Sequence, residues 1–261
     1  MSRRQILGLR TILTGASSGI GRCLALELAR QGARLVLTAR RQEELQELQG
    51  RIHNLGRESH LVVGDIVEPA VRQRLLETAT SELGGLDLLI NNAGVGAIGP
   101  FAEASEARLR RVMEVNFFAP AELIRSAVPL LQAGRRPMIV NVSSVLGHRG
   151  IPKKSEYCAS KFALHGLSDS IRAELVARGI DVLVVSPSTT ATEFFDNVLE
   201  KTADLPWLAL GAMSAEAVAR RAVQAIRRGR QEIILTPGGK LLVWFDRLCP
   251  PLVNRLVAKF G

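Results

Sequence analysis

Near its N-terminus the chain reads Arg10-Thr11-Ile12-Leu13-Thr14-Gly15-Ala16-Ser17-Ser18-Gly19-Ile20-Gly21. The first five residues predict a buried β-strand, and the residues from Ile20 onward have the apolar spacing of a helix. Glycines between a strand and a helix permit a tight turn and a close approach of the backbone to a pyrophosphate, whose charge sits at the helix N-terminus. The spacing is GxxxGxG rather than GxGxxG, but its place between a strand and a helix predicts a phosphate-binding loop rather than a structural turn.

Short apolar segments alternate with helical patterns along the rest of the chain. The predicted strands are Arg10–Thr14, Arg34–Thr38, Leu61–Gly64, Leu86–Asn91, Met138–Ser143, Ile180–Ser186 and Glu232–Thr236. The predicted helices are Ile20–Gln31, Arg41–Leu55, Glu68–Leu83, Ser105–Leu131, Glu156–Ala177 and Ser214–Arg227. Strands that are apolar on both faces and separated by helices predict a doubly wound parallel α/β sheet, a Rossmann fold of about seven strands with helices on both faces. We expect one domain over residues 1–261.

The length of 261 residues allows one large domain, and 47% hydrophobic with 23% charged residues is typical of a globular protein. Cys23, Cys158 and Cys249 are too few for a disulfide framework and form no CxxC pair, so we predict no metal site and a reducing compartment. The start lacks the apolar region of a signal peptide, and no stretch of about 20 apolar residues could span a bilayer. We therefore expect a cytoplasmic protein, peripheral to a membrane at most.

The net charge of +9 is concentrated at the C-terminal end. From Arg220 onward there are nine basic residues against two acidic ones, Glu232 and Asp246. A basic end can bind nucleic acid, anionic lipid or an acidic partner, or can be a solvated surface. No recognition motif or aromatic platform accompanies the charge, so we predict no nucleic-acid partner.

Two arginines follow the second predicted strand, in the segment Thr38-Ala39-Arg40-Arg41. In dinucleotide-binding folds this position usually carries an Asp or Glu that hydrogen-bonds the ribose 2′-hydroxyl of NAD. Here the carboxylate is absent, and guanidinium groups suit a 2′-phosphate. The sequence therefore predicts NADP (NADPH) as the cofactor, although Arg41 could instead be the basic start of the next helix.

A second group of residues indicates a reaction. Tyr157 and Lys161 stand four residues apart in a predicted helix and so share one face, and Ser144 follows the apolar run that begins at Met138. A tyrosine with a pKa of about 10 is a poor proton shuttle at neutral pH, but a neighbouring ammonium stabilises the phenolate. We expect Lys161 to lower the pKa of Tyr157 so that it acts as a general acid or base. Ser144 could hydrogen-bond a substrate oxygen where charge develops.

Together these residues resemble the short-chain dehydrogenase/reductase family, over nearly the whole chain. The similarity also rests on Asn91-Asn92-Ala93-Gly94 after the fourth strand and on Asn116. The resemblance implies that Tyr157 gives a proton to a substrate carbonyl oxygen, that Lys161 holds the nicotinamide ribose, and that Ser144 positions the substrate oxygen. Asn116 would hold a water that links Lys161 to solvent.

The resemblance also implies a set of cofactor-binding residues. Asp65 would contact the adenine amine, and Pro187 and Thr192 the nicotinamide amide. The full set is Gly15, Ser17, Ser18, Gly19, Ile20, Gly21, Arg40, Arg41, Asp65, Ile66, Asn92, Ala93, Gly94, Tyr157, Lys161, Pro187, Thr190 and Thr192. One position departs from the family pattern, because Ser188 stands where a glycine is common, and this would change how closely the backbone approaches the nicotinamide.

Two C-terminal segments are candidates for contact with an apolar ligand or surface. Residues 193–213 are rich in Phe, Trp and Leu and are predicted to form a lid over a lipophilic carbonyl, or else to pack on the domain. Residues 238–261 form a basic amphipathic tail, whose apolar helical face consists of Leu252, Val253, Leu256, Val257 and Phe260. Such a tail can lie at a membrane surface. A subunit contact and a lid on the core are the alternatives.

These features predict an NADPH-dependent oxidoreductase that reduces the carbonyl, or oxidises the alcohol, of a lipophilic substrate. Hydroxysteroid-like or long-chain lipid ketones are the first candidate substrates, and 3-oxoacyl thioesters are the second. The alternative of another class is a non-catalytic NADP-binding sensor or scaffold, which would have no use for the proton-transfer residues. By resemblance to the family, we expect a homodimer or homotetramer packed through the two long helices at Ser105–Leu131 and Glu156–Ala177.

Overall fold

A computed structural model describes residues 3–191, 194, 198–203 and 212–260. Its centre is a seven-stranded parallel sheet in the order β3-β2-β1-β4-β5-β6-β9. In chain order the strands are β1 (Arg10–Thr14), β2 (Arg34–Ala39), β3 (Ser59–Val63), β4 (Leu88–Asn91), β5 (Met138–Val142), β6 (Asp181–Ser186) and β9 (Glu232–Ile234). A second ladder pairs β7 (Thr190–Ala191) with β8 (Met213–Ser214). The doubly wound parallel sheet predicted from the sequence is confirmed.

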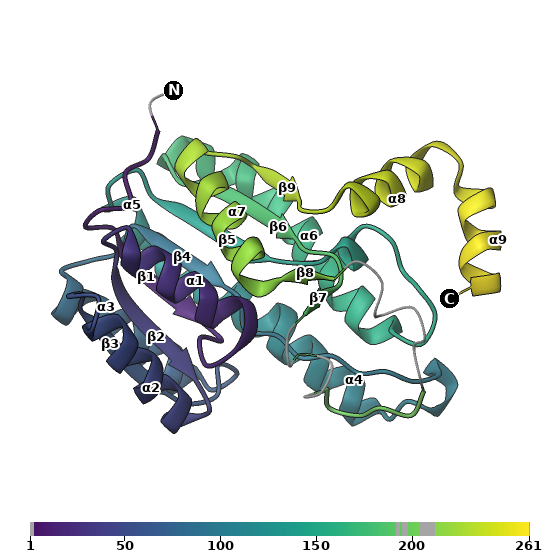
Figure 1. Cartoon of the computed structure of the whole chain (residues 1–261), viewed down its shortest axis with the longest axis horizontal. Helices are drawn as coiled ribbons and strands as arrows, with labels where there is room; N and C mark the ends of the chain where they lie inside the picture. The colour runs from purple at the N-terminus through teal and green to yellow at the C-terminus, as the bar shows by residue number, and fades with distance from the viewer. Residues whose placement is uncertain (1–2, 192–193, 195–197, 204–211, 261) are drawn as a thin grey trace.

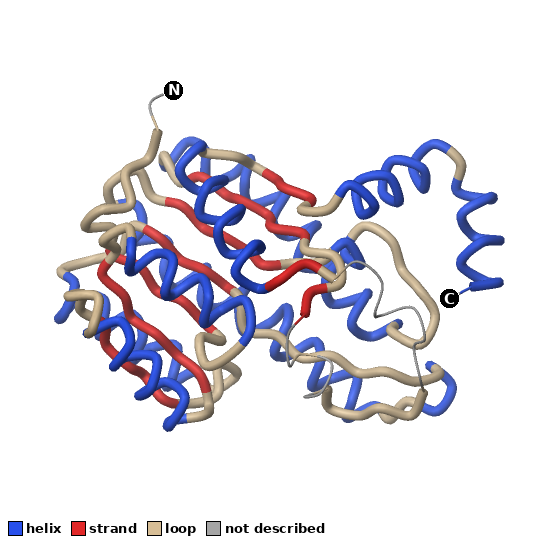
Figure 2. The backbone as a smooth tube through the Cα atoms, viewed as in Figure 1, coloured by secondary structure: helices blue, strands red, loops and turns tan. Residues whose placement is uncertain are grey.

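Helices cover both faces of the sheet (Figures 1 and 2). One apolar layer joins the sheet to α1 (Gly19–Arg30), α2 (Gln42–His53) and α7 (Ala215–Arg228). The other joins it to α3 (Pro69–Leu83), α4 (Glu106–Met113), α5 (Ala119–Gln132) and α6 (Ser155–Leu175). Successive strand residues alternate between these layers, so that Leu13 belongs to the first and Ile12 to the second. Both are fully buried, and each such side chain stabilises the fold by about 1.5–3 kcal/mol.

The long helix predicted at Ser105–Leu131 is interrupted. Between α4 and α5 lies a π-helical turn, η2 (Glu114–Phe118). Pro120 lies at the start of α5 and has no N–H to give to the Asn116 carbonyl four residues earlier, which favours a wider turn here. Widened turns of this kind often occur at functional sites. This one carries Asn116.

Single 3₁₀ turns fill several connections: η1 (Phe101–Glu103), η3 (Val145–Gly147) and η4 (Val176–Arg178). The last predicted strand is shorter than expected, because the Thr236 hydroxyl accepts a hydrogen bond from the Gly239 N–H at 3.0 Å and begins a helix. That helix is α8 (Pro237–Leu248), and α9 (Pro250–Phe260) follows it. Figure 1 shows the pair extending away from the sheet. Within the described residues, no helix combines the length and the apolar character needed to cross a membrane.

A buried ion pair joins α4 to the start of α6. Arg108 donates from Nε and Nη2 to Glu156 Oε1 at 2.8 and 2.6 Å, and both residues are almost completely shielded from solvent. Arg108 also lies 3.4 Å from Glu200. Because α6 begins at Ser155, this pair fixes the end of the helix that carries Tyr157.

We predict that Arg108→Met lowers the free energy of unfolding by about 3–5 kcal/mol, because it leaves the Glu156 carboxylate buried without its partner. Urea unfolding measures this. Arg110→Met is the matched control: Arg110 forms an exposed pair with Glu106 on the same helix, and its loss should change stability by about 0.5 kcal/mol or less. Equal effects of the two substitutions would contradict the prediction.

Candidate active site

One cavity of about 920 Å³ runs along the carboxyl ends of the central strands. This is where doubly wound sheets bind ligands, at the point where the strand order reverses, here between β1 and β4. All of the predicted cofactor-binding residues that the structure describes line this cavity. Thr192 lies outside the described residues. Ser144 also lines the cavity, whereas Asn116 lies buried behind its wall.

The glycine loop after β1 is closely packed against the end of β4. A Cβ at Gly15 would lie 2.7 Å from the Cα of Ala93, and a Cβ at Gly21 would lie 2.0 Å from the Gly15 carbonyl oxygen. The Asn92 side chain donates to the Thr14 and Gly15 carbonyl oxygens at 3.0 Å each. The loop therefore has room only for backbone, as a phosphate-binding turn requires, and Asn92 acts here by holding that turn in place.

The two arginines after β2 differ in their surroundings. Arg40 is exposed at the edge of the cavity. Arg41 is half-buried, and its guanidinium lies 3.3 Å from Glu44 and donates to Ser17 Oγ at 3.4 Å. Arg41 is therefore tied to the start of α2 and to the glycine loop, and Arg40 is the better placed of the two to meet an anionic group.

Asp65 forms an ion pair with Arg111, a residue of α4 that sequence reasoning did not identify as part of the site. The second carboxylate oxygen accepts the Val67 N–H at 3.1 Å. Burial alone would raise the pKa of Asp65, but the hydrogen bonds from Arg111 and Val67 outweigh it and hold that pKa below its usual value. Arg111 itself lines the cavity, so it adds a second cation on the side of the cavity near β2 and β3.

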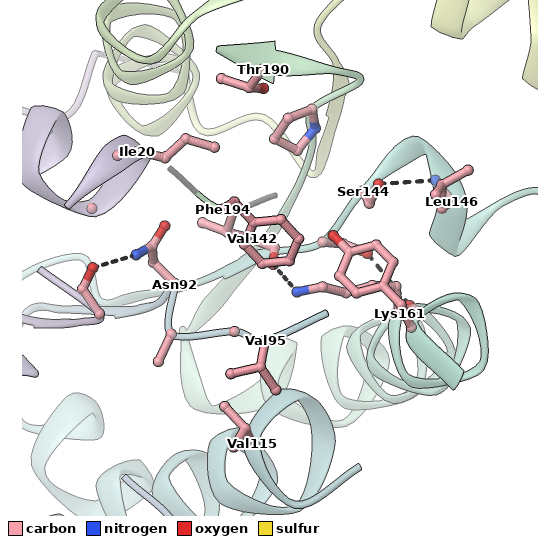
Figure 3. Close-up of a pocket in the computed structure, with 18 of the residues that line it drawn as sticks. Ile20, Asn92, Val95, Val115, Val142, Ser144, Leu146, Lys161, Thr190 and Phe194 are labelled. Carbon is pink, nitrogen blue, oxygen red and sulfur yellow. Dashed lines mark hydrogen bonds between the residues drawn. The ribbon is translucent and has the colours of Figure 1, made fainter. Parts of the chain in front are cut away.

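Tyr157, Lys161 and Ser144 meet on the side of β5 and β6. Lys161 donates from Nζ to the Val142 carbonyl oxygen at 2.9 Å, and Nζ lies 5.7 Å from the centre of the Tyr157 ring (Figure 3). Ser144 follows β5 and caps η3, where its Oγ accepts the Leu146 N–H at 3.1 Å. The i,i+4 placement of Tyr157 and Lys161 on one face of α6 is as predicted.

The expected lowering of the Tyr157 pKa by Lys161 is not found in this structure. Burial raises the pKa of Tyr157 to about 12, and a hydrogen bond with Ser144 offsets only part of that rise. Burial also lowers the pKa of Lys161 to about 8. The prediction assumed a charged ammonium in water-like surroundings, whereas Lys161 is buried and Tyr157 is largely enclosed, which shifts both groups towards their neutral forms.

Asn116 joins the loop after β4 to α6. Its Oδ1 accepts the Val95 N–H, and its Nδ2 donates to the Val95 carbonyl and to Ser160 Oγ, each at 2.9 Å. Ser160 Oγ in turn donates to the Tyr157 carbonyl at 2.8 Å. In this structure Asn116 therefore connects the loop after β4 to α6, the helix that carries Tyr157, through hydrogen bonds. Its predicted role in holding a water stays a prediction.

Residues 10–203 match the family model described as short chain dehydrogenase. The chain belongs to the short-chain dehydrogenase/reductase family. A relative from Xenopus laevis, named hydroxysteroid 11-beta-dehydrogenase 1-like protein B, is 33% identical over 265 residues, which cover 98% of this chain and 89% of that protein.

Solved members of the short-chain dehydrogenase/reductase family share the fold closely. A short-chain dehydrogenase/reductase from Burkholderia phymatum in complex with NAD superposes with a TM-score of 0.87 at 26% identity, covering 95% of this chain and 96% of that one. A short-chain dehydrogenase from Burkholderia cenocepacia in complex with NADP gives a TM-score of 0.81 at 27% identity, covering 91% and 100%. The fold of this family binds a nicotinamide cofactor, and the narrow glycine loop and cationic edge of this chain fit such a group.

Two residues of the cavity wall in this short-chain dehydrogenase/reductase, Phe194 and Lys154, bear on its substrate. Phe194 lines the cavity, and its ring centre lies 5.6 Å from that of Tyr157. Most of the predicted lid, at 193, 195–197 and 204–211, lies outside the described residues. Lys154 is buried in the cavity wall three residues before Tyr157, and burial lowers its pKa to about 8. Sequence reasoning missed Lys154, because a lone lysine at a helix start carries no signal.

Ser188 stands where the family commonly has glycine, and the structure shows how it is accommodated. Ser188 is not among the residues with positive φ, which besides glycines are Arg136 and Lys153 in the described part of the chain. Its carbonyl accepts a hydrogen bond from Thr190 Oγ1 at 3.0 Å, and both residues line the cavity. The backbone at this position therefore does not need the conformational freedom of glycine.

Proposed function

We propose that this short-chain dehydrogenase/reductase uses NADPH to reduce the carbonyl group of a lipophilic substrate. The observation that carries the proposal is the meeting of Tyr157, Lys161 and Ser144 in one cavity with the glycine loop and Arg40. A bound nicotinamide supplies a hydride to the carbonyl carbon. The residues of this chain have to hold that carbonyl, stabilise its oxygen and provide a proton.

Tyr157 is the proton donor in this proposal. With a pKa raised to about 12 by burial, the phenol is protonated at neutral pH and can give its proton to the carbonyl oxygen. The Ser144 hydroxyl can hydrogen-bond the same oxygen as charge develops on it. Lys161 lies beside the ring that is left as a phenolate. A protonated phenol is the form needed for reduction, whereas oxidation of an alcohol would need Tyr157 as a base.

We expect Tyr157→Phe to lower kcat by about a hundredfold to ten-thousandfold, the usual contribution of a positioned general acid. NADPH binding, measured by fluorescence titration, should remain, because the ring and its packing against Phe194 are kept. Turnover of a ketone, followed by NADPH consumption, gives the rate. An unchanged rate would refute Tyr157 as the donor, and a wild-type protein that binds NADPH but reduces no carbonyl would favour the sensor or scaffold alternative.

The preference for NADPH rests on Arg40. It is exposed at the cavity edge after β2, and no carboxylate stands there to hold a ribose 2′-hydroxyl. Arg40→Ala should raise the KM for NADPH by about tenfold to a hundredfold, since a hydrogen bond to a charged group contributes about 1.5–3 kcal/mol. The KM for NADH should hardly change.

Arg51→Ala is the matched control for Arg40→Ala, because Arg51 is an exposed arginine on α2 outside the cavity and its loss changes the net charge equally. If both variants raised the KM for NADPH alike, the effect would be long-range electrostatics. If Arg40→Ala left the NADPH-to-NADH ratio unchanged, the proposed 2′-phosphate contact would be refuted.

A lipophilic substrate is supported by the part of the cavity next to Tyr157. Phe194 packs beside Tyr157 there, and the cavity is lined further by the apolar side chains of Val145, Leu146, Ile151, Met213 and Leu242, together with the polar Ser144 and Lys154. The name of the Xenopus relative points to a steroid, which is such a molecule. We propose hydroxysteroid-like or long-chain ketones first and 3-oxoacyl thioesters second, and a panel of these three classes with NADPH ranks them.

We further propose that α8 and α9 rest on an anionic membrane surface. Leu241, Trp244 and Leu248 of α8 are exposed by 70%, 62% and 78%. Leu252 and Leu256 continue the apolar surface on α9. The basic residues of the two helices are Lys240, Arg247, Arg255 and Lys259, and Asp246, their only acidic residue within 237–260, is paired with Arg149. Exposed Trp and Leu beside basic side chains suit a lipid surface, and a contact with another subunit is the alternative.

We predict that the protein floats with vesicles containing phosphatidylglycerol and not with vesicles of phosphatidylcholine alone, and that salt weakens the association. Trp244→Gln combined with Leu248→Gln should abolish flotation, whereas Val176→Gln, which changes an exposed apolar residue on the body of the protein, should not. Failure to float, together with a dimer that the double variant dissociates, would assign these helices to subunit contact instead.

A further inference from the structure

Two histidines and a glutamate that play no part in the proposed reaction meet at one edge of the sheet. His148 follows η3, His165 lies on α6 and Glu232 begins β9. None of the three lines the cavity. We refer to His148, His165 and Glu232 as the histidine cluster.

The potential ligand atoms of the histidine cluster converge. All three lie within 4.8 Å of one another. Glu232 Oε1 lies 3.2 Å from His148 Nε2 and 4.0 Å from His165 Nε2. Ligands of a tetrahedral zinc ion, bound at about 2.0–2.2 Å, are roughly 3.3 Å apart. His148 and Glu232 already have that separation, and His165 Nε2 lies less than about 1 Å beyond it from Glu232 Oε1.

The chemistry of the cluster also suits a metal ion. The two imidazole rings lie edge to face, with centres 4.4 Å apart, so two cations at these positions would repel. A histidine has an ordinary pKa of about 6.5, so a neutral imidazole with a free nitrogen lone pair is readily formed at physiological pH. Imidazole nitrogens with one carboxylate form the ligand set of many zinc sites.

A second carboxylate stands close by. Asp169 Oδ2 lies 3.6 Å from His165 Nε2, one turn further along α6. Its other oxygen accepts from Arg172 at 2.6 Å. Two basic side chains near the cluster are Arg172, which is paired with Asp169, and Arg247, whose charge acts on His148. The carboxylate of Glu232 would offset part of the charge of a divalent ion.

We propose that His148, His165 and Glu232 bind a zinc ion, with Asp169 or water in the fourth position. Such an ion would be structural rather than catalytic, because its ligands lie outside the cavity. It would connect three parts of the fold: the turn that follows Ser144, the helix that carries Lys161 one turn before His165, and the last strand. Zinc bound at His148 Nε2 would take the place of the present 3.0 Å contact between that nitrogen and Ser186 Oγ.

The test uses the full chain without a histidine tag, stripped of metal by a chelator. Zinc ions added alone should bind as one ion per chain in isothermal titration and should raise the melting temperature by several degrees. Cobalt(II), which absorbs visible light strongly in tetrahedral sites, reports the geometry. Magnesium should neither bind in isothermal titration nor raise the melting temperature, because it prefers oxygen ligands in octahedral sites. None of these readouts involves turnover, so they stand apart from the proposed reductase activity.

Glu232→Gln and His165→Gln should each weaken zinc binding at least about tenfold. Glu232 is partly exposed, so its substitution leaves the fold intact even if the change at His165 does not. His60→Gln is the matched control. His60 lies on β3, at the opposite edge of the sheet from β9, and pairs there with Glu82 of α3. Zinc affinity that is unchanged in Glu232→Gln, or absent from the wild type, would show that the cluster is only a hydrogen-bonded group of side chains.

Discussion

The carboxamide of Asn116 joins three segments that must keep their relative positions for the site to exist. It holds both backbone groups of Val95 in the loop after β4 and also bonds Ser160 on α6, one turn from Tyr157. The helix that carries Asn116 widens to a π turn at this point, where Pro120 removes one backbone hydrogen bond. The buried pair of Arg108 and Glu156 joins α4 to α6 at the residue directly before Tyr157. The helix that carries Tyr157 is thus positioned by polar groups that cannot move without losing partners in a dry interior.

Charge in the cavity is strongly one-sided. Among the described residues that line it, Arg40, Arg41, Arg111, Lys154 and Lys161 are basic and Asp65 is acidic, and Asp65 is already paired with Arg111. Burial holds the pKa of both lysines at about 8, so part of their charge is suppressed. An opposite charge nearby favours the ammonium form. An anionic dinucleotide in the cavity would therefore strengthen the ammonium form of Lys161 beside Tyr157. In the protein alone, burial keeps the pKa of Tyr157 at about 12.

The C-terminal helices link the cavity to the outside of the molecule. Leu242 of α8 lines the cavity, while Leu241 and Trp244 of the same helix face solvent. One helix therefore contributes both to the wall of the cavity and to the surface proposed to meet lipid. The histidine cluster includes Glu232 of β9, the strand that pairs with β6 and directly precedes α8 in the chain.

The sequence by itself determined the elements and the motifs that depend on near neighbours. Apolar spacing defined the seven strands, although the last one ends at Ile234, and the glycine loop and the i,i+4 pair of Tyr157 and Lys161 lie where their spacing placed them. These features depend on residues within one or two turns of each other, so a local pattern suffices. Tertiary structure alone decided the pairing of Arg111 with Asp65, the burial of Lys154 and the meeting of residues 148, 165 and 232. It also decided that the pKa of Tyr157 is raised rather than lowered. Desolvation depends on every segment that covers a group, and those segments come from distant parts of the chain.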